Sequence, residues 1–187
     1  MGEIKSAWEI AQEKAAKLGE LSPEEKRRQK EDRCRLIGKS LAEKYLGEHD
    51  TQHLEAELNK HNDEDKALIN QAVLHQLIER IDLRYSLTLD RISQGILSLV
   101  KAETAVKTVG KIKELFQEYR EAEKEKRQEI ERAGSEILHQ LRISGTAISQ
   151  INVQAKDEWQ KKLSEVARPY EERLSRLKQE LSSNARV

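Results

Sequence analysis

The chain has 187 residues, which suits a single domain, and its 34 basic and 34 acidic side chains give a formal net charge of zero. This balance disfavours an obligate nucleic-acid binder, which needs an excess of cations to neutralise phosphates. There is no run of 18 apolar residues, no secretory signal pattern and only one cysteine, so we expect a cytoplasmic protein that makes no membrane contact.

The first expected helix runs from Ser6 to Gly19, where Ser6 and Glu9 have the spacing of a capping box. The second begins at Ser22, because Ser22-Pro23 combines a preferred capping residue with proline at the first helical position. We expect Gly47 to end this second helix. Its first half, up to Arg33, is almost entirely polar and should project into solvent or against a partner.

A short third helix is expected over 51–60, followed by a break at 61–63 in which Asn62 or Asp63 caps the next helix. The next element, 63–142, is a long helix or a helical hairpin. Its apolar stripe has heptad-like spacing and consists of Leu74, Ile78, Ile81, Tyr85, Leu89, Ile92, Ile96 and Leu99.

Three features complicate this long element. Poor helix formers before Gly110 predict a kink or a turn there. Residues 83–89 also alternate apolar and polar side chains, so they could instead pair with 141–153 in a small two-stranded sheet. The charged stretch 120–129 has almost no core face and should stand clear of the main body.

Residues 143–155 combine Gly145 with β-branched side chains, which indicates a packed, non-helical segment. The C-terminal segment 156–187 contains a last helix from about Asp157 to Leu181. Its apolar stripe passes through Pro169, so we expect a kink there and not an end. The chain 1–187 is therefore interpreted as one helical domain, with 1–62 forming its N-terminal short helices.

Two stretches of sequence resemble an uncharacterised family of bacterial all-helical proteins. The first contains Lys5-Ser6-Ala7-Trp8-Glu9-Ile10-Ala11, followed by Leu21-Ser22-Pro23-Glu24-Glu25. The second contains Ile143-Ser144-Gly145-Thr146-Ala147, followed by Glu158-Trp159-Gln160. The resemblance implies a bacterial cytosolic protein, but it implies no activity.

One row of side chains has spacing suited to metal ligands. His49, His53, Glu57 and His61 recur every four residues, and side chains at i and i+4 share a helix face, so pairs such as His53 and Glu57 could hold a divalent cation. His49 and His61 fall near or beyond the helix ends, however, and an exposed polar face is the favoured interpretation. No cofactor is expected, because the sequence contains no phosphate-binding glycine loop and no dinucleotide fingerprint.

Other residues are candidates for binding a partner. Trp8 and Trp159 are large enough to anchor an interface, but both lie on apolar stripes, which favours a place in the core. Lys26, Arg27 and Arg28 form part of a basic stretch that could touch a nucleic acid, although a solvated helix face is favoured.

Together these patterns predict an all-α protein of five to seven helices, arranged as an elongated bundle of long, partly coiled-coil antiparallel helices. The narrow seam 159–181 suggests a homodimer that buries it. The leading functional hypothesis is a non-enzymatic scaffold, adaptor or co-chaperone-like protein that binds another protein. The alternatives are a metal-binding bundle or enzyme that uses the histidine row, and a nucleic-acid-associated coiled coil.

Overall fold

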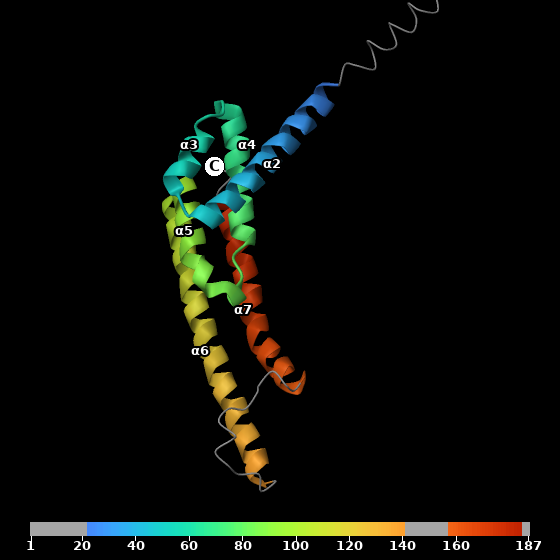
Figure 1. The fold of residues 1–187 in the computed structure, drawn as a ribbon, viewed down its shortest axis with the longest axis vertical. Helices are drawn as coiled ribbons and strands as arrows, with labels where there is room; N and C mark the ends of the chain where they lie inside the picture. The colour runs from blue at the N-terminus through green and yellow to red at the C-terminus, as the bar shows by residue number, and fades with distance from the viewer. Residues whose placement is uncertain (1–21, 141–156, 185–187) are drawn as a thin grey trace, which may run out of the picture.

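A computed structural model describes residues 22–140 and 157–184. Within these ranges the chain forms six α-helices and one 3-10 helix, and it contains no strand, which confirms the all-α prediction for this part of the protein. The elements are α2 (Pro23–Glu48), α3 (Thr51–Leu58), α4 (Asp63–Glu79), η1 (Leu83–Thr88), α5 (Leu89–Leu99), α6 (Glu103–Gln140) and α7 (Asp157–Asn184) (Figure 1). None of these helices is both long enough and apolar enough to cross a membrane.

The start of α2 matches the expectation, and its end does not. Ser22 caps the helix through a capping box, in which the Glu25 amide donates to Ser22 Oγ (3.2 Å) and the Ser22 amide donates to Glu25 Oε2 (2.7 Å). The prediction that Gly47 ends the helix is wrong, because α2 continues to Glu48 and His49 adopts the left-handed conformation (φ 59°). The His49 amide donates to Tyr45 O, which closes the last turn.

The expectation of one long element over 63–142 is also wrong in its details. The chain leaves the helical path after Glu79, forms η1, and is interrupted again between α5 and α6. Gly110 lies inside α6, so a hairpin turn near Gly110 does not occur. Residues 83–88 are a 3-10 helix, which excludes the proposed strand there, and 141–153 lie outside the described residues.

Asp82 explains the first break. Its carboxylate accepts from the Arg84 amide (2.9 Å) and from Arg84 Nε (3.0 Å), so it caps η1 instead of continuing α4. Buried Leu83 and Leu89 bring the chain back to the core on either side of this corner. A heptad-like stripe cannot reveal the turn, because the same leucines would satisfy a straight helix.

The main core lies where α2, α4 and α5 meet the early part of α6 and the late part of α7. Two glycines allow this close packing. A Cβ on Gly38 would lie 2.5 Å from the Ala72 Cβ and 2.9 Å from the Ile69 carbonyl oxygen, so α2 and α4 touch almost backbone to backbone. A Cβ on Gly95 would meet the ring of Tyr45, whose hydroxyl donates to Arg91 O (2.8 Å).

Helices α6 and α7 lie side by side and extend together beyond η1, away from α2 and α3 (Figure 1). Later residues of α6 contact earlier residues of α7. Thr108 Oγ1 donates to Glu180 Oε1 (3.0 Å), Arg173 Nη1 donates to Glu118 Oε2 (2.6 Å), and Ile130 packs with Trp159. The last pair, with Leu163, forms a second apolar cluster that is separate from the main core.

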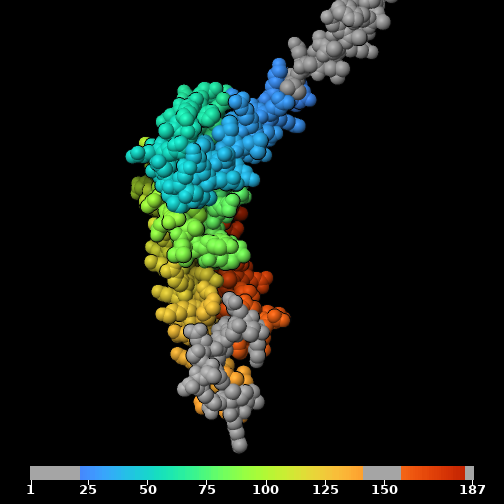
Figure 2. All heavy atoms as spheres, in the orientation of Figure 1, coloured from blue at the N-terminus to red at the C-terminus, as the bar shows by residue number. Residues whose placement is uncertain are grey.

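The opposite end of the molecule carries another projection. Residues 22–29 are all exposed, and Figure 2 shows the beginning of α2 standing out from the body. Lys30 makes the first long-range contacts of the helix, with Glu64 (2.6 Å) and Asp65 (2.9 Å) at the start of α4. The polar first half of α2 therefore has no core face among the described residues.

Candidate functional site: a groove over α4

A hollowed surface follows the outer side of α4. One cavity of about 610 Å³ lies between α4 and α7, lined by His75, Ile78, Glu79, Ser175, Lys178, Gln179, Ser182 and Ser183. Another, of about 590 Å³, lies between α2 and α4, lined by Glu31, Arg35, Leu68, Gln71, Ala72, His75 and Gln76. His75 belongs to both linings, so we treat the two cavities as one surface, the α4 groove.

The α4 groove combines an apolar floor with polar edges. Leu68 and Ala72 are half-buried and Ile78 is buried, so they supply the floor. His75 is exposed at the middle, and its Nδ1 lies 3.7 Å from Glu79 Oε2 one turn later on the same helix. An apolar floor with a few polar groups around it is the usual composition of a surface that binds a ligand or a peptide.

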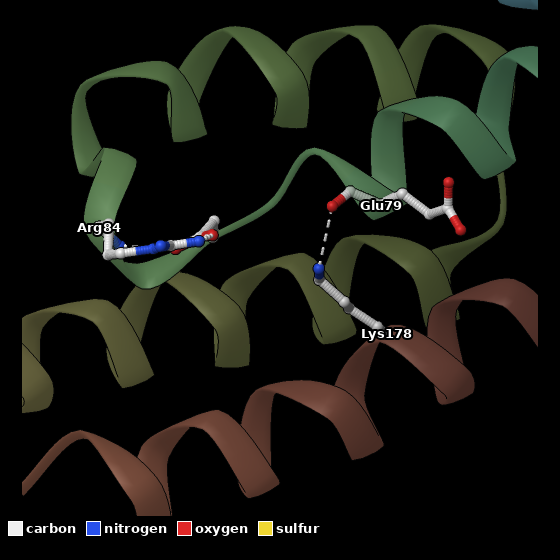
Figure 3. Close-up of polar contacts among 4 residues, drawn as sticks. Glu79, Arg84 and Lys178 are labelled. Atoms are coloured by element: carbon white, nitrogen blue, oxygen red, sulfur yellow. Dashed lines mark hydrogen bonds and ion pairs between the residues drawn. The ribbon is translucent and has the colours of Figure 1, made fainter. Parts of the chain in front are cut away.

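Lys178 closes the groove on the α7 side. Its ammonium group donates to the backbone oxygen of Glu79 (3.2 Å), the last residue of α4 (Figure 3). Figure 3 also shows the Glu79 carboxylate pointing away from Lys178. Burial lowers the pKa of Lys178, although the negative charges of Asp82 and Glu79 act in the opposite direction.

The η1 corner lies next to this end of the groove. Arg84 pairs with Asp82 and lowers the pKa of that carboxyl to about 2, because the guanidinium and the Arg84 amide both donate to the ionised form. Beyond the pair, Tyr85 and Leu87 are 61% and 90% exposed. The corner therefore shows two large apolar side chains to solvent close to a charged, ordered turn.

The histidine row is only partly assembled. His53 Nε2 lies 3.6 Å from Glu57 Oε1, but Glu57 is also paired with Lys60 (2.7 Å). His49 sits at the left-handed end of α2, within 2.7 Å of Arg91, and His61 follows the end of α3. Within 22–140 and 157–184, no group of three or more His, Cys, Asp or Glu side chains is arranged to hold a metal ion.

The candidate partner residues have different surroundings. Trp159 is only 9% exposed and packs with Ile130, in agreement with the favoured core interpretation. Trp8 lies outside the described residues. Lys26, Arg27 and Arg28 are exposed on the projecting part of α2, and Arg27 lies 3.6 Å from Glu31.

Sequence reasoning missed the α4 groove. Its edges come from α2 and α7. These helices are separated from α4 along the chain, so the sequence does not show that they lie beside it. Lys178 lies between Leu174 and Leu181, which belong to an apolar heptad-like stripe. A lysine between two such positions is expected to face solvent. The exposed face of α4 was the one available signal, since Gln71, His75 and Glu79 recur at four-residue spacing.

Comparisons with known proteins return no relative. No protein-family model matches the chain, and neither a curated protein nor a solved structure is significantly similar to it. The resemblance of the N-terminal residues to a bacterial helical family therefore stays a prediction.

Proposed function

We propose that this protein is a non-enzymatic interaction protein, a scaffold or adaptor, and that its α4 groove binds a helix of another protein. The observation that carries the proposal is the meeting of the two cavities at His75, which hollows one face of α4 between α2 and α7.

The dimensions of the α4 groove favour a helical occupant. From Leu68 to Glu79 the exposed side of α4 covers roughly three turns, or about 16 Å at 1.5 Å per residue. An amphipathic helix of similar length could place its apolar residues over Leu68, Ala72 and Ile78, as in the helix-in-groove mode of recognition. Both signs of charge line the edges, with Arg35 and Glu31 on α2 and Lys178 on α7.

The proposed architecture is an elongated adaptor with two projecting parts. The pairing of Thr108 with Glu180 and of Ile130 with Trp159 supports an antiparallel, partly coiled-coil arm formed by α6 and α7. The polar start of α2 forms the other projection. Residues 22–29 of α2 and the part of α7 around Trp159 do not line the α4 groove, so these two parts could hold further partners.

The homodimer prediction now rests on a different surface. The seam 159–181 was expected to need a second copy, but α6 of the same chain covers it, and Tyr170, Leu174, Leu177 and Leu181 pack against the main core. A second copy could instead bind at the α4 groove or at the η1 corner, where Tyr85 and Leu87 are exposed. We keep the homodimer as an alternative that the experiment below distinguishes.

The test compares two matched histidine substitutions in the full-length chain. His75→Trp should fill the junction of the two cavities, whereas His139→Trp places the same side chain on an exposed position of α6. A tagged pull-down from a cell lysate, quantified by mass spectrometry, should show a stoichiometric partner with the wild type and with His139→Trp. His75→Trp should lose it.

Three results would count against this proposal. Equal partner recovery with both variants would remove the α4 groove from the interaction. Recovery of only this chain, in a complex of twice its mass, would replace the foreign helix by a second copy. Stoichiometric metal in the purified protein would favour the metal-binding alternative.

A further inference from the structure

Lys178 differs from the other lysines in the described part of the chain. Many of these lysines lie within 4 Å of a carboxylate, among them Lys60, Lys111 and Lys113. Lys178 has no carboxylate at that distance and instead donates to a backbone carbonyl. It is also the lysine in these ranges whose pKa is lowered, with burial as the main cause.

The charged groups around Lys178 do not form an ion pair with its amine, although the charges of Asp82 and Glu79 partly offset the effect of burial on its pKa. On α4, His75 Nδ1 lies 3.7 Å from Glu79 Oε2, and Figure 3 shows the Glu79 carboxylate turned away from the amine. After α4, Asp82 is held by Arg84. A lysine with a lowered pKa has more of its amine in the neutral, nucleophilic form near neutral pH.

The cavity beside the amine is lined by residues that can form hydrogen bonds with a small reagent. The 610 Å³ cavity is lined by Ser175, Ser182, Ser183 and Gln179, all on α7 with Lys178. The Ser183 hydroxyl already donates to Gln179 O (2.6 Å), whereas those of Ser175 and Ser182 make no hydrogen bond within the described residues. These two hydroxyls can therefore donate to the oxygens of a phosphate or a carbonyl group.

We propose that Lys178 is a covalent modification site that accepts a small acyl group from an acyl phosphate. The neutral amine attacks the acyl carbonyl carbon, so that a C–N bond forms and the C–O bond to phosphate breaks. Phosphate leaves with the bonding electron pair, and the amine releases a proton to solvent. The product is a neutral amide in place of an ammonium group. This chemistry does not depend on the partner-binding function proposed above.

The test uses acetyl phosphate as the probe and the full chain as the target. Acetylation at each lysine is followed over time by peptide mapping. Lys101 and Lys161 serve as internal controls, because both are exposed and neither has a carboxylate within 4 Å in the described residues. Lys178 should be acetylated severalfold faster than either control. The ratio of the acetylation rate at Lys178 to the rates at the controls should grow as the pH is lowered from about 9 to about 7. Ordinary lysines, with a pKa near 10.4, lose their neutral form at higher pH than a lysine with a lowered pKa.

Two variants separate the amine from the cavity. Lys178→Arg should remove this adduct and leave the rates at Lys101 and Lys161 unchanged. A Ser175→Ala/Ser182→Ala double variant, checked for unchanged helix content, should slow acetylation at Lys178 severalfold but not at the controls. Reaction at Lys178 no faster than at Lys101 and Lys161 would overturn the proposal. An unchanged rate in the serine variant would overturn the acyl-phosphate site and leave a merely reactive amine.

Discussion

At the scale of single residues, Gly38 and Gly110 give opposite predictions for the same substitution. A methyl group at Gly38 meets the Ala72 side chain and the Ile69 carbonyl, and backbone atoms cannot move aside, whereas at Gly110 nothing lies within 4 Å. Gly38→Ala should therefore lower the free energy of unfolding by about 1–3 kcal/mol through overpacking.

Gly110→Ala is the matched control, and it should raise the free energy of unfolding by about 0.5–1 kcal/mol, because alanine is the better residue inside a helix. Urea unfolding followed by circular dichroism measures both changes. A tolerated Gly38→Ala would mean that α2 and α4 are not in such close contact.

Asp82 and Arg84 provide a pH-dependent prediction. The pKa of Asp82 is lowered to about 2 from an ordinary value of 3.8, so its contribution to stability is present above pH 3.8 and is lost as the pH falls through about 2. Arg84→Gln should raise the pKa of Asp82 toward 3.8, which a carboxyl NMR titration would detect. The same titration in a Lys113→Gln variant serves as a control, because Lys113 pairs with Asp90 instead. An unchanged pKa of Asp82 in Arg84→Gln would contradict the pairing.

At the scale of helices, the first turn of α2 should be coupled only weakly to the rest of the fold. Ser22→Ala removes the capping hydrogen bond to the Glu25 amide, a loss of about 1 kcal/mol for the helix end. Because residues 22–29 are exposed, the effect should be local fraying. Hydrogen exchange should speed up in the first turn of α2 and stay unchanged in α4. Equal loss of protection in both helices would show that the projection is part of the core.

The far part of the α6–α7 pair should likewise open without the main core. Ile130 is buried against Trp159 in a cluster that is separate from the principal one. Ile130→Ala should cost about 2–5 kcal/mol locally, so exchange should rise in 120–138 and 159–166 while α4 and α5 stay protected. Leu115→Ala, in the main core, is the comparison and should destabilise the whole molecule. A single cooperative loss of protection in Ile130→Ala would argue against an independent arm.

Helix existence was easier to predict from the sequence than helix ends and breaks. The Ser22-Pro23 start of α2 follows from local chemistry, which the sequence displays directly. The break at 80–88 depends on whether Leu83 and Leu89 face one core or a straight seam, and both arrangements fit the same spacing. His49 ends α2 instead of Gly47 because the Tyr45 ring and Arg91 hold it there, and these are tertiary contacts.

At the scale of the whole molecule, the candidate site could not be predicted from the sequence. Lys178 and Glu79 are 99 residues apart, and the groove that α4 and α7 share exists only where these two helices pack together. The residues that attract attention in the sequence, such as Trp159, serve packing instead. A binding surface made of ordinary side chains has no motif, so it becomes visible only when the helices are placed together.

Site-specific photocrosslinking in cells tests the helix-binding α4 groove most directly. A photoreactive amino acid would replace Gln71 or Gln179, which line the groove, and in control chains Gln128 or Gln160, which are exposed elsewhere on α6 and α7. We predict one common adduct with another protein from both groove positions, mapped by mass spectrometry to a helical segment of that protein, and none from the controls. The same adduct at similar yield from all four positions, or none from the groove positions, would contradict the assignment of the α4 groove as the partner-binding surface.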